Sequence, residues 1–152
     1  YGADPMNLDP AEHGLEPALA LRSYVAAVKP IAPGESTGYG RHFIAQRDSY
    51  IATLPIGYGD GLPRALKNNC DVLIGGGRYP LCGMVSMDNI TVDVGPNPSV
   101  AVGDLGTIIG TDGAERQTAE DLARRLGTIN YEVLCWISRR VPRVYHRDGV
   151  PA

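Results

Sequence analysis

The sequence predicts a mainly β domain, a barrel-like arrangement of short antiparallel strands with a small helical element near the C-terminus. Two observations carry this prediction. Short apolar, β-branched runs separated by glycine and proline fill the chain as far as Thr118, which is typical of all-β barrels and sandwiches. A helical pattern with a cap and a stop appears only after that residue.

Turn residues divide the chain into strand-length segments. The run Ala18 to Lys29 predicts one long strand, and Pro33-Gly34 predicts a turn between Pro30 and Glu35. Gly75-Gly76-Gly77 between two apolar runs predicts a hairpin. The remaining predicted strands are Ser36–Tyr39, Ser49–Ile56, Asp71–Ile74, Arg78–Cys82, Ile90–Val94 and Leu105–Ile109.

Two short helices are predicted after the strands. Thr118 and Asp121 form a variant of the capping box, and Gly127 is placed to end the first helix. Asn130 is expected to cap a second helix from Tyr131 to Ser138. Arg139-Arg140 would then supply positive charge at the C-terminal end of this helix, and Pro142 predicts an extended segment as far as Tyr145.

Composition narrows the possible functions. The chain has 152 residues and a formal net charge of −3 spread along its length, so it offers no basic face for nucleic acid or an anionic membrane. Its apolar runs are too short to span a membrane. The three cysteines and three histidines are scattered, without the spacing of a metal site or a disulfide framework. We therefore expect a cytoplasmic protein with reduced thiols and no metal.

The first segment differs from the rest of the chain. Residues 1–17 carry prolines and acidic residues without a hydrophobic period, so they are predicted to be a linker. Residues 18–152 are then the folded domain.

The stretch Leu54 to Arg64 contains the most unusual local pattern. Its sequence is Leu-Pro-Ile-Gly-Tyr-Gly-Asp-Gly-Leu-Pro-Arg, in which Gly57 and Gly59 flank Tyr58. A tyrosine after a strand commonly packs back on that strand. The two glycines remove the neighbouring side chains that would bury it, which favours a phenol presented to another molecule.

Three separated motifs together point to one family. They are Gly57-Tyr-Gly-Asp-Gly61, Gly83-Met-Val-Ser-Met-Asp88 and Gly127-Thr-Ile-Asn-Tyr-Glu-Val-Leu-Cys135, the last continuing to Arg140-Val-Pro-Arg-Val-Tyr145. In this order and spacing the chain resembles the C-terminal domain of alanine racemases from about Leu19 to Tyr145. The resemblance implies that residues 1–17 lead from an N-terminal α/β barrel that this chain lacks.

The resemblance implies interconversion of L- and D-alanine, which supplies D-alanine for peptidoglycan. The family uses pyridoxal 5'-phosphate, which serves as an electron sink, and two acid/base groups on opposite faces of the substrate. A lysine that holds the cofactor serves one face, and the tyrosine matching Tyr58 serves the other. A phenol has a reference pKa of about 10, so this tyrosine needs a proton-accepting partner. In the family that partner is a barrel histidine, which we expect outside this chain.

The resemblance also implies two binding residues and a homodimer. Met87 would offer its backbone N–H to the substrate carboxylate, and Tyr145 would donate a hydrogen bond to the cofactor phosphate within its own subunit. Tyr58 would act in the active site of the other subunit, so each homodimer would contain two shared sites.

The chain does not carry the whole site. It has only two lysines, Lys29 and Lys67, and neither fits a cofactor-lysine pattern. The chain alone is therefore expected to form no Schiff base with the cofactor and to be inactive. Two positions depart from the family pattern: Met84 replaces a frequent arginine of the substrate access path, and Gly59 stands where alanine is commoner. A racemase for serine or several amino acids, or a β domain that binds without catalysis, remain alternatives.

Overall fold

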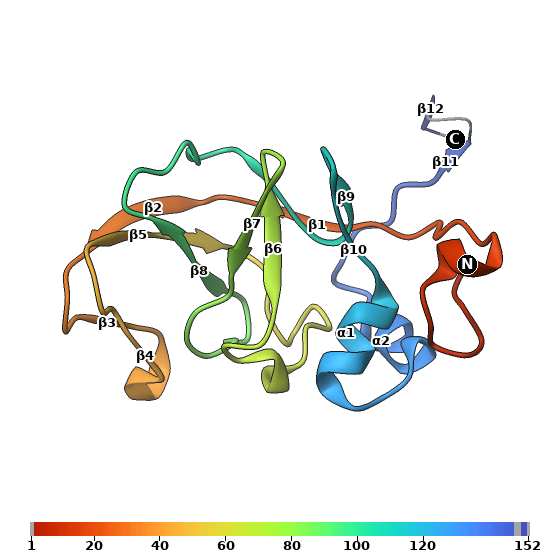
Figure 1. Ribbon diagram of the computed structural model, residues 1–152, viewed down its shortest axis with the longest axis horizontal. Helices are drawn as coiled ribbons and strands as arrows, with labels where there is room; N and C mark the ends of the chain where they lie inside the picture. Colours follow the sequence, from red (N-terminus) through yellow and green to blue (C-terminus); the bar gives the residue numbers. More distant parts are fainter. Residues whose placement is uncertain (1, 148–149, 152) are drawn as a thin grey trace.

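The computed structural model describes residues 2–147 and 150–151, in which the strands pair in antiparallel fashion (Figure 1). The larger sheet has the order β1 (Leu21–Tyr24), β9 (Leu105–Asp112), β6 (Asp71–Ile74) and β7 (Gly77–Pro80), with β10 (Glu115–Gln117) paired to β9. The second sheet has the order β2 (Ala27–Ile31), β5 (Ser49–Leu54) and β8 (Ile90–Gly95). Two small pairs join β3 (Ser36–Thr37) to β4 (Phe43–Ile44), and β11 (His146–Arg147) to β12 (Val150–Pro151). The predicted mainly β fold is confirmed.

The predicted long strand from Ala18 to Lys29 is wrong, because the chain divides there between two sheets. The Val25 N–H donates to the Asp104 carbonyl at 2.8 Å, whereas the Ala26 N–H donates to the Thr53 carbonyl at 2.8 Å. The backbone therefore changes partners between two consecutive residues. β1 belongs to the larger sheet and β2 to the second one.

A second connection joins the two sheets on their other side. Leu81 forms an isolated antiparallel bridge with Val92 of β8, directly after β7 ends. The strands thus follow a barrel-like circuit from β1 through β9, β6, β7, β8, β5 and β2. Its interior is filled by apolar side chains, among them the buried Leu54, Val72 and Ile108.

Two turns illustrate how local sequence sets the strand boundaries. Gly75 and Gly76 form a two-residue hairpin turn with φ of 58° and 78°, and Gly77 already pairs with Ile74. The predicted turn from Pro30 begins too early, because Pro30 lies inside β2. Proline is tolerated there since β2 is an edge strand, paired only with β5.

The first helix is α1 (Ala119–Leu126), and its predicted ends are confirmed. The Asp121 N–H donates to Thr118 Oγ1 at 3.2 Å, while the Thr118 N–H donates to Asp121 Oδ2 at 2.7 Å. Gly127 ends the helix with φ of 70°.

The second helix is α2 (Asn130–Trp136), and its predicted boundaries are wrong at both ends. Asn130 is the first helical residue and not the cap. Its side-chain amide donates instead to the Asp4 carbonyl and to Glu120 Oε1, both at 2.7 Å. The helix ends two residues before the predicted Ser138, because the backbone becomes extended at Ile137.

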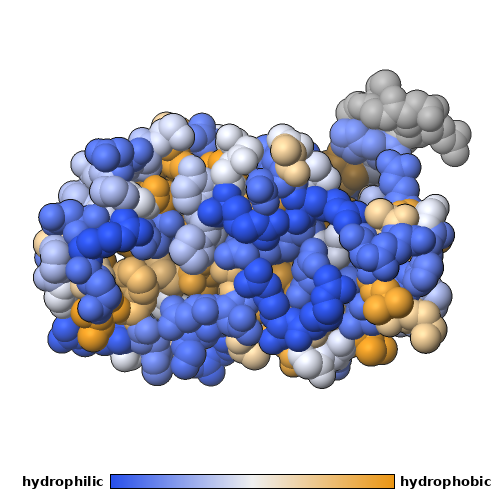
Figure 2. Space-filling view, in the orientation of Figure 1, coloured by the Kyte–Doolittle hydropathy of each residue, from blue (hydrophilic) through white to orange (hydrophobic). Residues whose placement is uncertain are grey.

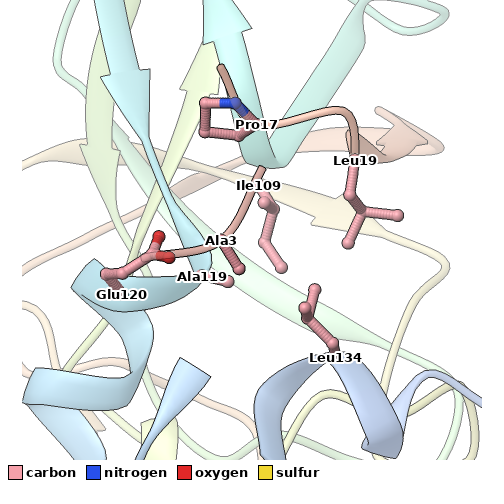
Figure 3. Close-up of a pocket in the computed structure, with 7 residues that line it drawn as sticks. All are labelled: Ala3, Pro17, Leu19, Ile109, Ala119, Glu120 and Leu134. Carbon is pink, nitrogen blue, oxygen red and sulfur yellow. The ribbon is translucent and has the colours of Figure 1, made fainter. Parts of the chain in front are cut away.

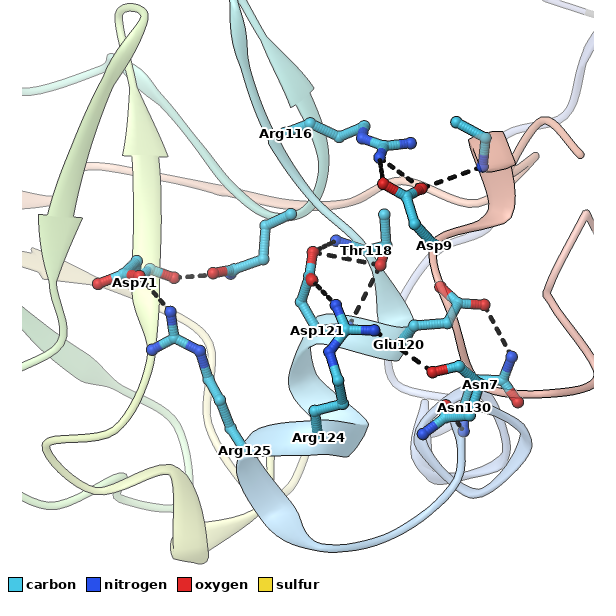
Figure 4. A network of polar contacts seen from close by, with 12 residues as sticks. Asn7, Asp9, Asp71, Arg116, Thr118, Glu120, Asp121, Arg124, Arg125 and Asn130 are labelled. Atoms are coloured by element: carbon cyan, nitrogen blue, oxygen red, sulfur yellow. Dashed lines mark hydrogen bonds and ion pairs between the residues drawn. The ribbon is translucent and has the colours of Figure 1, made fainter. Parts of the chain in front are cut away.

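The segment before residue 18 packs against the helices. It contains a 3-10 helix, η1 (Pro10–His13), and the buried Asp4 donates its backbone N–H to Glu120 Oε1 at 3.0 Å. Figure 4 shows the polar contacts around this junction, including the pair between Asp9 and Arg116 of β10 at 2.6 Å. That this segment connects to another domain stays a prediction.

Two pockets lie beside this segment. The smaller, of about 10 Å³ and thus large enough for about one water molecule, lies where the segment meets β9, α1 and α2 (Figure 3). Its lining is mostly apolar, with Ala3, Leu19 and Leu134 on different sides. A larger pocket of about 270 Å³ is lined by Leu15, Leu19 and residues of β9 and β10.

The surface carries separate hydrophobic and hydrophilic areas. On the face shown in Figure 2, hydrophobic patches occur toward two ends of the molecule, over the β3–β4 pair and over the helices, with hydrophilic surface between them. Of the helices that the structure describes, none has the length and apolarity needed to cross a membrane.

Candidate functional site

The loop that carries Tyr58 follows β5 and is closed by its own hydrogen bonds. The Gly57 N–H donates to Asp60 Oδ2 at 2.9 Å, and the Gly57 carbonyl accepts from the N–H groups of Asp60 and Leu62 at 3.0 and 3.1 Å. Leu62 is buried beneath the loop, whereas the Tyr58 side chain is 42% exposed. Tyr58 is therefore partly exposed, and its contact with another molecule stays a prediction.

The glycines beside Tyr58 have a more specific role than removing neighbours. The N–H groups of Tyr58 and Gly59 donate to the carbonyls of Ser86 and Met87, both at 2.9 Å. A Cβ atom added to Gly57 would lie 2.3 Å from the Ser86 carbonyl oxygen. Glycine is needed at this position because two backbones approach closely there.

The third motif reaches the same loop from the end of α2. The Ser138 N–H donates to the Asp60 carbonyl at 3.0 Å. Gly61 has φ of 111°, and a Cβ atom there would lie 2.2 Å from the Trp136 carbonyl oxygen. Backbone contacts thus bring together the three motifs that the sequence separates.

Arg140 adds an ionic link among these motifs. Its Nη2 lies 2.5 Å from Asp88 Oδ1, and its Nε lies 3.3 Å from Asp60 Oδ1. The hydrogen bond with Asp88 and the charge of Asp60 raise the pKa of the guanidinium. One cation therefore joins the residue after Met87 to a residue of the Tyr58 loop.

The structure groups two of the three predicted site residues. Met87 is 50% exposed and lies against the Tyr58 loop through its carbonyl. Among residues 2–147 and 150–151, its N–H donates to no backbone carbonyl. Tyr145 is 71% exposed and leads into β11, which stands apart from the sheets (Figure 1). Tyr145 is not part of the group formed by Tyr58 and Met87.

The two grouped residues lie away from the two pockets described above. Neither of the two pockets described above is lined by Tyr58 or Met87, and both lie at the N-terminal segment. In the part of the chain that is described, no three acidic, histidine or cysteine side chains gather as a metal site would require. Burial raises the pKa of the Cys70 and Cys82 thiols to about 12, so neither is a nucleophile near neutrality.

Sequence reasoning missed Arg140 and Asp60 as parts of this site. Both residues belong to the three motifs, but the motifs give neither of them a role. An available signal was an acidic residue one or two positions after two of the three candidate residues, in Tyr58-Gly-Asp60 and in Met87-Asp88. Two such acids predict a shared cation, but not which of the twelve arginines provides it.

The fold and this site define a β domain in which backbone hydrogen bonds hold the exposed Tyr58 beside the exposed Met87. Residues 18–145 match the family described as "Alanine racemase, C-terminal domain". The chain belongs to this family.

Individual relatives are similar to this chain over nearly its whole length. It is 45% identical over 150 residues to alanine racemase 1 of Clostridium acetobutylicum, covering 98% of the chain and 39% of that protein. It is 46% identical over 145 residues to the alanine racemase of Cutibacterium acnes, covering 95% and 38%. The structure of the Bacillus anthracis alanine racemase with bound L-Ala-P superposes with a TM-score of 0.89 at 36% identity, covering 99% and 39%. The chain spans about two fifths of the length of these relatives.

Proposed function

We propose that this chain is the C-terminal domain of an alanine racemase that depends on pyridoxal 5'-phosphate. Two observations support the proposal. The chain matches proteins named alanine racemase over almost its full length, and its family motifs converge on a loop that presents Tyr58 beside Met87. The proposed activity is the interconversion of L- and D-alanine, which supplies D-alanine for peptidoglycan.

Tyr58 is the proposed catalytic residue of this chain. Racemisation requires that the proton of the substrate Cα leave from one face and that a proton return to the opposite face. The phenol oxygen of Tyr58 would hold and transfer the proton on one of these faces. The fixed backbone of its loop suits this role, since proton transfer needs a donor and acceptor held within hydrogen-bond distance.

The chain can contribute to a cofactor site but cannot hold the cofactor covalently. When bound, pyridoxal phosphate supplies an electron sink for the charge left at Cα. The Tyr145 phenol would be one hydrogen-bond donor among several to its phosphate group. The lysines fit no covalent role, because Lys29 is exposed on β2 and Lys67 follows η3 (Arg64–Leu66). We therefore place the cofactor lysine outside this chain.

Met87 is the proposed substrate contact. Its backbone N–H would donate to the substrate carboxylate, which fixes the orientation of Cα relative to Tyr58. Because the donor is a backbone group, Met87→Leu should leave activity nearly unchanged.

The exposed position of Tyr58 and Met87 supports an active site completed by another protein surface. We propose a homodimer in which Tyr58 reaches the site of the partner subunit, in the cytoplasm, where the unpaired Cys70, Cys82 and Cys135 stay reduced.

The test replaces Tyr58 by phenylalanine in the full-length protein. Racemisation should fall by about 10²- to 10⁴-fold. Exchange of the α-proton with deuterated solvent, followed by NMR, should survive for one alanine enantiomer, because the base on the other face is intact. Tyr39→Phe is the control, since Tyr39 is 77% exposed and lies outside the three motifs. Equal loss of exchange for both enantiomers would contradict the assignment of Tyr58.

A further inference from the structure

Arg140 occupies a central position behind the proposed catalytic residue. Two different nitrogen atoms of its guanidinium contact acids on two separate loops: Nε contacts Asp60 at 3.3 Å and Nη2 contacts Asp88 at 2.5 Å. Asp60 also accepts the Gly57 N–H, so the same carboxylate closes the Tyr58 loop and binds the arginine.

The third nitrogen lies against the loop backbone. A Cβ atom added to Gly59 would lie 2.3 Å from Arg140 Nη1. The guanidinium thus packs directly beside the residue that follows Tyr58, and all three of its nitrogens face one of the two loops.

We propose that Arg140 is a positioning residue for Tyr58, which fixes the Tyr58 loop relative to the Met87 loop. This inference rests on the proposed function, because it assigns Arg140 a role only if Tyr58 transfers a proton. Arg140 does not act on the substrate itself. It holds the proton-transferring phenol and the carboxylate-binding N–H at one fixed separation.

Two physical arguments support this role over a contribution to stability. The Arg140 and Asp88 side chains are each about half exposed, and ion pairs in contact with solvent contribute little to folding. Asp60 is only 15% exposed, but its contact with the half-exposed Arg140 is longer, at 3.3 Å. Catalytic rates are much more sensitive than stability to the position of a reacting group, because a displacement of about 1 Å can lower the rate about a hundredfold.

Arginine is also the residue that this geometry requires. Its planar fork reaches two carboxylates in fixed directions with separate nitrogens, whereas the single ammonium group of lysine is a point charge on a flexible stem. Arg140→Lys should therefore retain the charge but restore only part of the positioning.

The first test measures the loop itself in the full-length protein. Hydrogen–deuterium exchange of the Tyr58 and Gly59 amides should become about three- to tenfold faster in Arg140→Gln. Arg139→Gln is the matched control, because Arg139 is an exposed neighbour without an ion pair among the residues described. Unchanged exchange in Arg140→Gln would overturn the proposal.

The second test separates positioning from other effects. In Arg140→Gln, kcat should fall about ten- to hundredfold with KM for alanine nearly unchanged. The loss should appear as slower α-proton exchange for the enantiomer that Tyr58 serves, and Arg140→Lys should show an intermediate loss. Adding Arg140→Gln to Tyr58→Phe should cause little further loss, because both changes disable the same group.

The remaining outcomes identify which idea fails. If Tyr58→Phe keeps full racemisation, the proposed function of Tyr58 is wrong. If Tyr58→Phe loses activity and Arg140→Gln keeps it, only the positioning role is wrong. If Arg140→Gln changes the oligomeric state in sedimentation, or if the losses of the two variants multiply, Arg140 acts elsewhere and the proposal is overturned.

Discussion

The buried carboxylate of Asp4 is hydrogen-bonded to Nδ1 of His13, a side chain that is 46% exposed. This pair closes the N-terminal segment on itself, because Asp4 also accepts the N–H of Met6 through Oδ1 at 2.6 Å. The hydrogen bond with His13 lowers the pKa of Asp4, and the same bond, together with the charges of Asp4 and Glu12, raises the pKa of His13.

The closure of this segment should therefore depend on pH. His13 has a raised pKa, so its contribution is complete below about 6.5 and is lost as pH rises through the raised value. Asp4 has a lowered pKa, so its contribution is present above about 3.8 and is lost as pH falls through the lowered value. The pair should thus be strongest between these two reference values.

Hydrogen exchange in the full-length protein tests this dependence. Protection factors of the Met6 and Asn7 amides should fall as the pH rises above about 6.5 in the natural protein but stay level in His13→Gln. His42→Gln is the control, since His42 follows η2 (Tyr39–Arg41) in another part of the chain. The same decline in His13→Gln would show that another group is responsible.

Gly57→Ala should destabilise the protein by about 1–3 kcal/mol, a typical cost of overpacking. The added Cβ atom would lie 2.3 and 2.5 Å from the carbonyl oxygens of Ser86 and Met87, and these backbone atoms cannot move independently. Gly59→Ala is a matched comparison with a smaller expected cost, because its nearest contact is the flexible end of Arg140. Urea unfolding measures the free energy of unfolding of both variants. Equal losses of stability would contradict the argument from close approach of the two backbones.

Tyr145→Phe should weaken binding of pyridoxal phosphate by about tenfold, the effect of losing one hydrogen bond to a charged group. Equilibrium dialysis of the full-length apoprotein against the cofactor measures this directly. Tyr131→Phe is an informative comparison, because Tyr131 lies in the Gly-Thr-Ile-Asn-Tyr motif and is 47% exposed on α2. If only Tyr131→Phe weakens binding, the phosphate contact belongs to Tyr131 and not to Tyr145.

Features set by neighbouring residues were predictable from the sequence. The hairpin at Gly75-Gly76 and the capping box of Thr118 and Asp121 depend on backbone preferences within a few positions. The prominence of Tyr58 also followed from its local pattern. Its exposed position agrees with the prediction.

Features set by distant partners were not predictable. Nothing in the run Ala18 to Lys29 indicates that Val25 and Ala26 pair with different sheets, because both halves have strand character. Asn130 has the residue type of a cap, but its side chain binds Asp4, 126 positions away. Arg140 likewise pairs with Asp88, 52 positions away, so only the folded chain reveals the link.

The hydrogen bond between Asp4 and Glu120 also indicates which residues must be inherited together. The residues matched by the family begin at 18, yet Glu120 is buried and bonds to both Asp4 and Asn130. If recombination joined a foreign N-terminal domain at residue 18, the protein would lose Asp4. The Glu120 carboxylate would then keep only one of these two donors, Asn130. A crossover upstream of Asp4 would transfer the complete set. Exchange of this domain between related genes should therefore be tolerated at the earlier junction and penalised at the later one.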